Sequence, residues 1–184
     1  MEKAINEDGL PLLGYTTRGP IDLVSASTGE MKKAHALSMM TMANGHFTEF
    51  YSVARHSVNC ALEATARGYS KRVALFCLLH DSAESYIGDM TRPLKMHFPL
   101  FSEYEKKLQK VIFSKYATLD IDDDEKEKVK SVDDSLLYHE FLCYHGDKLF
   151  DFTPEIHIDV KDNSKNISET EKEFLCMYEA LKIK

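Results

Sequence analysis

The segment RVALFCLLHDSAESYIGD, residues 72–89, sets an apolar run directly against ionisable side chains. Residues 73–79 are apolar throughout, which is typical of a buried helix, yet His80 and Asp81 follow at once. Glu84 stands one helical turn later. Because a buried ionised group is costly unless it is paired or binds a metal ion, this order indicates a metal or catalytic site at the end of a buried helix.

Two other segments also place ionisable residues on the apolar face of a predicted helix. Residues three and four apart share one face of a helix. By this spacing His56 falls on the inner face that also carries Cys60. Asp133 follows the spacing of the apolar residues around Val132, whereas Asp134 points away. The inward faces of three helices are therefore expected to meet at ionisable groups.

A divalent metal ion is the cofactor that this set of side chains predicts. The expected ligands are two imidazoles and two carboxylates, His56, His80, Asp81 and Asp133. Mixed nitrogen and oxygen ligation suits manganese, iron, cobalt, nickel or zinc better than magnesium or calcium. Four protein ligands leave room on a six-coordinate ion for water or a phosphate oxygen, as catalysis requires.

Helical periodicity dominates the chain after an N-terminal arm, residues 1–26, in which one short hairpin is expected around residues 15–23. Helices are predicted over residues 27–40, 48–66, 71–86, 101–117 and 122–143, and a last one opens with a cap at Ser168 and Glu171. The segment between the last two helices reads as an irregular loop. We therefore predict an all-α fold, in which residues 27–184 form a single compact helical bundle.

Composition excludes several classes of function. A chain of 184 residues with 43% hydrophobic content is the usual size for one domain with a real core. Its net charge of −7 argues against binding a nucleic-acid polymer or an anionic membrane surface. No apolar run reaches the roughly 18 residues of a membrane span, and the N-terminus lacks a signal-peptide core. A cytoplasmic location is expected.

Several other residues that could do chemistry have ordinary explanations. The cysteines at 60, 77, 143 and 176 form no CxxC pair, which favours buried, reduced thiols over disulfides or zinc thiolates. The acidic run of residues 120–127 lacks the spacing and glycine of an EF-hand and reads as a solvated helix start. The histidines at 97, 139, 145 and 157 are interpreted as incidental.

Three segments resemble one known superfamily when they are taken in order. They are GHFTEFYSVARHS (residues 45–57), LLHDSAESYIGDMTRPLK (78–95) and VKSVDDSLLYHE (129–140). Together they are similar to the HD-domain metal-dependent phosphohydrolases, and most of all to the small single-domain branch that holds bacterial 5'-deoxynucleotidases and phage deoxynucleoside triphosphate triphosphohydrolases. The resemblance covers roughly residues 35–140, and GYTTRGPIDL and AHALS also resemble the N-terminal part of that branch.

The resemblance implies roles for individual residues. It gives His56, His80, Asp81 and Asp133 as the metal ligands, the same four that helical spacing indicates. Glu84 would orient or deprotonate the attacking water, Asp89 would protonate the departing ester oxygen, and Lys95 would hold phosphate. An additional magnesium ion, carried by the substrate phosphates, is compatible with this scheme.

One segment departs from the family pattern. Where the family has an arginine and an aromatic residue shortly before the Gly-His pair, this chain has Met42 and Ala43. The phosphate contact must come from another cation, and the candidates are Arg18, Arg55, Arg92 and Lys95. Met42 would offer a thioether surface to the base, and His46 completes the set of candidate substrate-binding residues.

The leading hypothesis is a deoxynucleoside triphosphate triphosphohydrolase that prefers dATP and releases deoxynucleoside and triphosphate. A 5'-deoxynucleotidase acting on monophosphates is the first alternative. A catalytically idle HD domain that binds nucleotides is the second, and cyclic-nucleotide hydrolysis fits the same ligands less well. The expected partner is a small-molecule deoxynucleotide, in a homo-oligomer that works in the cytoplasm, which is the host's if a phage encodes the chain.

Overall fold

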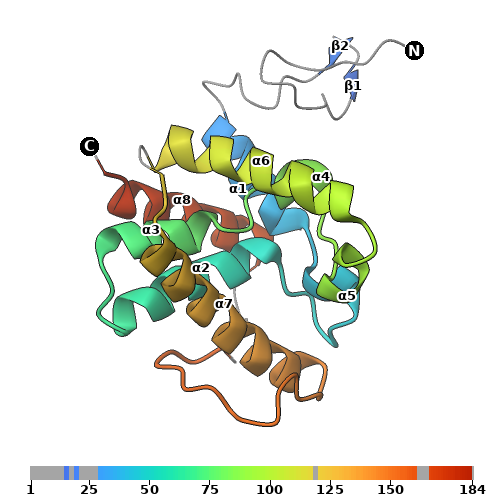
Figure 1. Ribbon diagram of the computed structural model, residues 1–184, viewed down its shortest axis with the longest axis vertical. Coiled ribbons are helices and arrows are strands. Elements are labelled where there is room, and N and C mark those ends of the chain that lie inside the picture. The colour runs from blue at the N-terminus through green and yellow to red at the C-terminus, as the bar shows by residue number, and fades with distance from the viewer. Residues whose placement is uncertain (1–14, 17–18, 21–28, 118–119, 161–165, 184) are drawn as a thin grey trace.

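The computed structural model describes residues 15–16, 19–20, 29–117, 120–160 and 166–183. The prediction of an all-α fold is confirmed (Figure 1). The α-helices are α1 (Gly29–Met39), α2 (Val53–Ala66), α3 (Lys71–Leu79), α4 (Glu84–Ile87), α5 (Arg92–Lys95), α6 (Pro99–Tyr116), α7 (Asp123–Tyr144) and α8 (Ile167–Leu181). A 3-10 helix covers Met42–Gly45.

The expected hairpin in the N-terminal arm is present as two short antiparallel strands. They are β1 (Tyr15–Thr16) and β2 (Gly19–Pro20), and Thr16 is paired with Gly19. The other residues of the arm, including the candidate phosphate ligand Arg18 and the predicted cap at Ser27, lie outside the described part of the chain. Within that part, no helix is both long enough and apolar enough to cross a bilayer.

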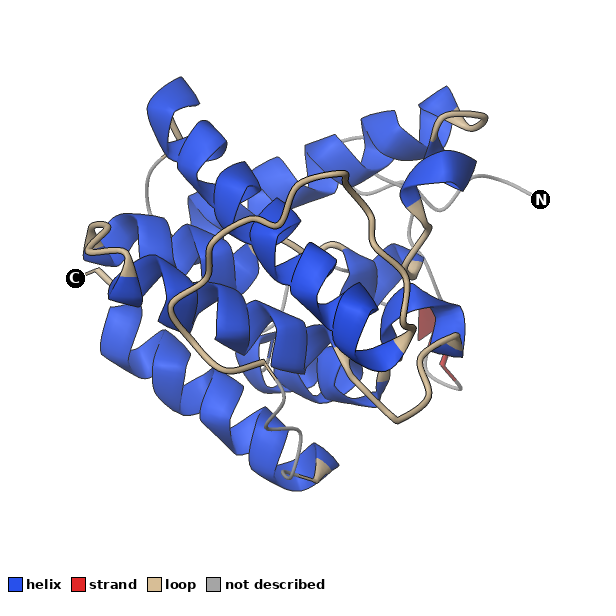
Figure 2. Ribbon diagram, turned by 90° about the horizontal axis from the view of Figure 1, so that it is seen from below, coloured by secondary structure: helices blue, strands red, loops and turns tan. Residues whose placement is uncertain are grey.

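The hydrophobic core lies around α2 and α3, which pack against each other and against α7 and α8 (Figures 1 and 2). Val58 of α2 and Leu75 and Phe76 of α3 are fully buried. Burying an apolar side chain of this size contributes about 1.5 to 3 kcal/mol. Because α2 and α3 are covered on nearly all sides, any polar group that they carry must find its partners inside the protein.

Two predicted helix starts are wrong. The second helix begins after Ser52, whose side chain accepts a hydrogen bond from the Arg55 amide, and not at residue 48, because Ser52 forms an extended bridge with Thr41. The last helix is capped by Asn166 and Glu169, two residues earlier than predicted. The predicted helix start in the acidic run is confirmed, and Asp122 and Glu125 form a capping box there.

The prediction of one continuous helix over residues 71–86 is also wrong. α3 ends at Leu79, the chain turns, and α4 begins at Glu84. The side chain of Gln109 in α6 donates to the carbonyl of Leu79 at 2.6 Å and accepts from the amide of Ala83 at 3.0 Å. These two backbone groups would bond to each other in a helix, so the inserted side chain breaks the ladder. His80 therefore stands at the very end of α3.

The four cysteines are free, but only half of the burial prediction is right. Cys60 and Cys77 are buried in the core. Cys143 and Cys176 are exposed, at the end of α7 and on the outer face of α8. Proximity to apolar residues in sequence indicated burial, but near a helix end or on an outer face those neighbours point elsewhere.

Candidate metal centre and active site

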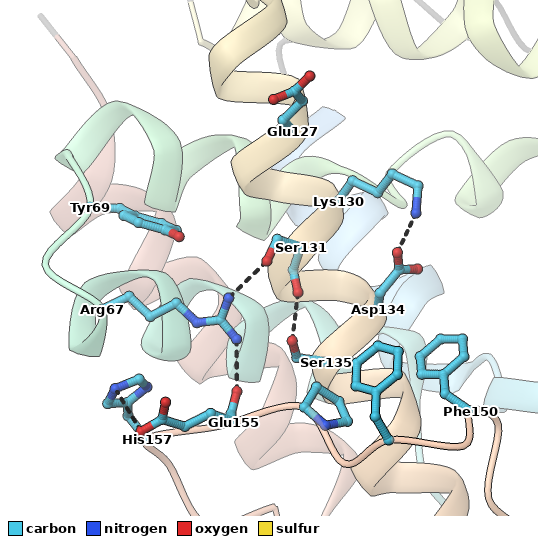
Figure 3. A pocket seen from close by; sticks show the side chains of 12 residues that line it. Arg67, Tyr69, Glu127, Lys130, Ser131, Asp134, Ser135, Phe150, Glu155 and His157 are labelled. Atoms are coloured by element: carbon cyan, nitrogen blue, oxygen red, sulfur yellow. Dashed lines mark hydrogen bonds and ion pairs between the residues drawn. The ribbon is translucent and has the colours of Figure 1, made fainter.

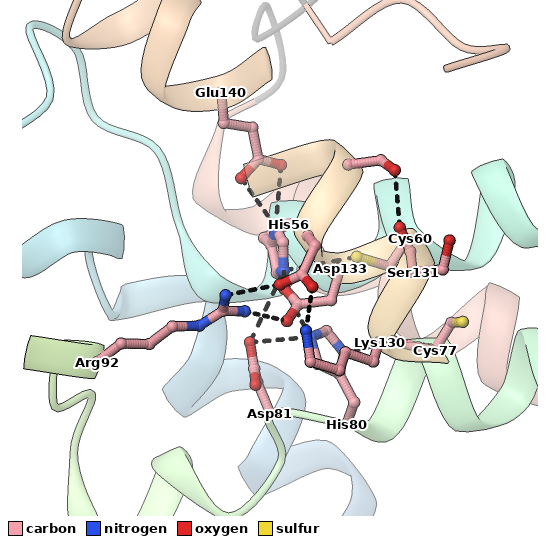
Figure 4. Close-up of polar contacts among 12 residues, drawn as sticks. His56, Cys60, Cys77, His80, Asp81, Arg92, Lys130, Ser131, Asp133 and Glu140 are labelled. Atoms are coloured by element: carbon pink, nitrogen blue, oxygen red, sulfur yellow. Dashed lines mark hydrogen bonds and ion pairs between the residues drawn. The ribbon is translucent and has the colours of Figure 1, made fainter. Parts of the chain in front are cut away.

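Two histidines present the same ring nitrogen to one point (Figure 4). His56, from the first turn of α2, is fully buried, and its Nδ1 lies 2.8 Å from Glu140 Oε2. His80, at the end of α3, has its Nδ1 2.7 Å from the carbonyl oxygen of Cys77. A ring nitrogen that faces an acceptor carries the proton, which leaves the lone pair on Nε2. Both imidazoles are therefore held in the tautomer that binds a metal through Nε2.

The two predicted carboxylate ligands reach the same point from different elements. Asp133 Oδ1, from α7, lies 3.2 Å from His56 Nε2 and 3.7 Å from His80 Nε2. Asp81 Oδ2, from the turn after α3, lies 3.2 Å from His80 Nε2 and 3.8 Å from His56 Nε2. The structure thus brings together all four residues that the sequence analysis selected as ligands.

Cys60, which the sequence analysis assigned to the core, also belongs to the cluster. Its Sγ lies 3.5 Å from His56 Nε2, and the ligand atoms of His56, Cys60 and His80 all lie within 4.8 Å of one another, a group that could hold a metal ion. The sequence signal was its position one turn after His56. Burial raises the pKa of the Cys60 thiol, which disfavours the thiolate that a metal needs.

The electrostatics of the cluster favour positive charge. Burial alone would lower the pKa of His80, but the nearby carboxylates of Asp81 and Asp133 outweigh burial and raise it well above its usual value. The pKa of His56 is likewise raised against burial, by Cys60 and Glu140. The two imidazoles hold the pKa of Asp133 well below its usual range, although burial opposes this. Protons on the imidazoles or one divalent cation would supply the positive charge that the carboxylates favour.

Glu84 and Asp89 lie next to the cluster and carry raised pKa values. Burial, with the charges of Asp81 and Asp89, raises the pKa of Glu84 to about 10. Burial and Asp81 also raise the pKa of Asp89. Among the described residues, Glu84 Oε2 is buried without a hydrogen-bond partner. Lys95 Nζ lies 3.8 Å from Glu84 Oε1 and 2.6 Å from Glu105 Oε1, so this predicted phosphate ligand stands beside the candidate base.

Arg92 joins the cluster directly, whereas Arg55 turns away from it. Arg92 donates to Asp133 Oδ2 and to Asp134 Oδ1, both at 2.6 Å (Figure 4). Asp134, which was expected to point away, therefore shares a cation with the candidate ligand. Arg55 is buried, and it donates to Glu173 at 2.7 Å and to Thr170 at 3.0 Å, both in α8. Its charge is compensated there, so the structure does not place it as a phosphate ligand.

The other two candidate substrate-binding residues, Met42 and His46, differ in exposure. Met42 is buried in the hydrophobic core, and its amide donates to the carbonyl of Tyr51. His46 is exposed just after the 3-10 helix. Ala43 and Asn44 have positive φ values of 50° and 51°, a conformation that few residues other than glycine adopt. The segment that departs from the family pattern therefore forms a tight loop.

Two cavities lie near α7. One, of about 650 Å³, is lined by His80 and Asp133 and by side chains of α6 and α7. The other, of about 820 Å³, is lined by Arg67, Phe150 and His157 among others (Figure 3). In the second cavity Arg67 is already bonded to Glu63, to Ser131 and to the carbonyl of Glu155. Only the first cavity adjoins the histidine cluster.

Comparison with known proteins gives short and partial likenesses. No family model matches the chain. The uncharacterized protein YfdR of Escherichia coli is 36% identical over 83 residues, which is 45% of this chain and 44% of that protein. The aryl-phospho-β-D-glucosidase BglH of Bacillus subtilis is 46% identical over 52 residues, 28% of this chain and 11% of its own length. The 6-phospho-β-glucosidase AscB of E. coli is 75% identical over 28 residues, 15% of this chain and 6% of its own length.

The chain thus spans less than half the length of each of these relatives. A match that covers about a tenth of a glucosidase does not carry a whole active site across. Support for a function lies in the residues of the cluster itself.

Proposed function

We propose that this chain is a metal-dependent phosphohydrolase of the HD-domain type that acts on deoxynucleotides. The observation that carries the proposal is the common orientation of the two imidazoles. Glu140 fixes His56 and the Cys77 carbonyl fixes His80, so that both Nε2 atoms face the point where Asp81 and Asp133 meet.

The donor set fits a divalent transition metal. His80 Nε2 is buried and, within the described part of the chain, has no hydrogen-bond partner, an arrangement that metal ligation would satisfy. His56, His80, Asp81 and Asp133 would hold the ion, and two nitrogen and two oxygen donors suit manganese, iron, cobalt, nickel or zinc. When bound, the ion supplies a Lewis acid for a phosphoryl oxygen and for the attacking water.

The chain's own residues supply the proton transfers. Glu84 is the candidate base: positive charge at the cluster opposes the carboxylates that raise its pKa and allows it to accept a proton from water. Asp89, whose pKa is raised by burial and Asp81, is suited to keep a proton and give it to the departing oxygen. Lys95 and Arg92 stand beside these groups and are candidates for the phosphate.

Within this class we favour a triphosphohydrolase that attacks the α-phosphorus of a deoxynucleoside triphosphate, with dATP as the preferred substrate. The test is a side-by-side assay of dATP and dAMP with manganese, cobalt, zinc or magnesium. We expect deoxyadenosine and triphosphate from dATP. Deoxyadenosine and inorganic phosphate from dAMP, without triphosphate from dATP, would instead support a 5'-deoxynucleotidase. No turnover of either substrate would support a nucleotide-binding domain without activity.

A further inference from the structure

We propose that the cavity between α6 and α7 holds the polyphosphate tail of the substrate, and that four lysines in its wall select a triphosphate over a monophosphate. This inference rests on the proposed function of the adjoining cluster. It also supplies the phosphate contact that the sequence lacks where the family has an arginine.

The cavity joins the candidate reaction centre to a wall of positive charge. It has a volume of about 650 Å³, within the usual range for a small-molecule site, and His80 and Asp133 are among its lining residues. Each of two helices contributes a pair of lysines spaced four residues apart: Lys106 and Lys110 from α6, and Lys126 and Lys130 from α7. Residues at this spacing share a helix face, so both lysines of each pair can line the same cavity. Lys130 also lines the second cavity, where its ammonium group pairs with Asp134.

The charges of two of these lysines are not compensated inside the protein. Among the described residues, Lys106 and Lys110 have no carboxylate within ion-pair distance. On an acidic chain with a net charge of −7, two such cations in one cavity are a local exception. A positive pocket of this kind favours an anionic ligand.

The other two lysines have partners that they can exchange. Lys126 pairs with Asp123, whose side chain is 96% exposed, and solvent screens an exposed pair of this type so that it contributes little to stability. Lys130 pairs with Asp134, which also receives a hydrogen bond from Arg92. If Lys130 turned to a phosphate, Arg92 would still compensate Asp134.

The other residues of the cavity wall strengthen the ion pairs that these lysines can form and connect the lysines to the reaction centre. Phe113, Ile121 and Val129 are apolar and lower the local dielectric, which strengthens ion pairs. Gln109, also in the wall, is the side chain that breaks α3 at His80. Asp120 is a carboxylate in the same wall, so the four lysines are opposed there by Asp120 and Asp133. A triphosphate can meet several of these lysines at once, whereas a monophosphate held at the centre leaves most of them without a ligand.

Direct binding of inorganic tripolyphosphate tests the cavity without any hydrolysis. Calorimetric titration would compare the full-length wild type with the double variant Lys106→Gln/Lys110→Gln. The matched control is Lys107→Gln/Lys128→Gln, which removes the same number of charges, one from α6 and one from α7, at positions paired with Glu103 and Asp124 outside the cavity. We expect the dissociation constant to rise about 10- to 100-fold in the first variant and to stay unchanged in the control.

Two binding results would overturn the cavity assignment: equal affinity for tripolyphosphate in all three proteins, or a wild type that binds tripolyphosphate no more tightly than inorganic phosphate. Hydrolysis then separates this proposal from the one on which it rests. Lys106→Gln/Lys110→Gln should lose at least about ten times more kcat/KM on dATP, mainly through KM, than on bis(p-nitrophenyl) phosphate, which has no polyphosphate tail. A wild type that binds tripolyphosphate but hydrolyses neither substrate would contradict the proposed function and would still support the anion site.

Discussion

Glu63 and Glu140 are both fully buried carboxylates, but the groups around them differ in kind. Glu63 accepts hydrogen bonds from Arg67 Nε at 2.7 Å and from the amide of His157 at 2.7 Å. Glu140 accepts from the Tyr51 hydroxyl at 2.7 Å and faces His56 Nδ1. Arginine keeps its charge at every physiological pH, whereas a phenol and an imidazole can remain neutral.

The difference separates a structural cluster from a functional one. The charge of Glu63 is cancelled by Arg67, and the pair ties α2 to the loop that carries His157. Glu140 stands at one end of a chain of contacts whose other end, His56 Nε2, faces Asp81 and Asp133. The protein therefore supplies the counter-ion for the first glutamate and leaves the second cluster in need of a cation. Substitutions at the two clusters should have opposite signatures.

The largest effect is expected from a substitution at Asp81, at the far end of the series of contacts that runs from Glu140 through His56. Asp81→Asn keeps the size of the side chain but removes a charged ligand, so the cluster should lose its metal and its activity. We expect kcat on dATP to fall by about a thousandfold or more. The far-ultraviolet circular dichroism spectrum should not change. Turnover at the wild-type rate would show that Asp81 is not a metal ligand.

Glu63→Gln should act on the fold and not on the chemistry. Breaking a buried pair leaves Arg67 without its counter-ion, which costs about 3 kcal/mol. The midpoint of thermal unfolding should fall by about 6 to 12 °C. Activity per folded molecule and metal content should match the wild type. A variant with normal stability and lost metal would reverse the assignment of the two glutamates.

Glu140→Gln should produce the complementary result. The amide can no longer hold the His56 ring as firmly, and loss of such an orienting partner weakens metal affinity by about 10- to 100-fold. Competition with a metal-sensitive dye measures this change, and Glu63→Gln is its matched control. Equal metal affinity in the two variants would show that Glu140 does not orient the ligand.

The pH dependence of stability sharpens the contrast at Glu63. Burial alone would raise the pKa of Glu63, but hydrogen bonds from Arg67 and His157 outweigh burial and hold it below its usual value. A carboxyl of this kind stabilises the fold above its unfolded-state pKa, about 4.3, and the contribution is lost as the pH falls through the folded-state value. The difference in unfolding free energy between wild type and Glu63→Gln should therefore shrink below about pH 5. Urea titrations across this range measure it, and a difference that grows in acid would contradict it.

Local signals in the sequence were enough to predict that the four candidate ligands meet at one point. His56 and Asp133 follow the apolar spacing of their helices, and the His80–Asp81 pair ends an apolar run. The inward orientation of these residues could therefore be predicted without knowing the fold. The capping box at the start of α7 was also predictable, because its two members lie within one turn.

Features that depend on distant contacts could not be predicted in this way. The break after Leu79 is made by Gln109, which lies 30 residues further along the chain. Arg55 was a candidate for phosphate until α8 was seen to supply Glu173. His157, interpreted as incidental, turns out to be a partner of Glu63. The sequence analysis did not single out Lys106, and it placed Lys126 within a solvated helix start. Only the packing of α6 near α7 brings them to one cavity.

Metal stoichiometry tests the central claim most directly. Full-length protein is stripped of metal and reloaded with cobalt, and bound cobalt is then measured together with its visible spectrum in wild type, Asp81→Asn and Cys60→Ser. We predict about one ion per chain in wild type and Cys60→Ser, without a thiolate charge-transfer band, and loss of the ion in Asp81→Asn. Absence of stoichiometric cobalt in the wild type, or its loss in Cys60→Ser but not in Asp81→Asn, would contradict the cluster of two imidazoles and two carboxylates proposed for this chain.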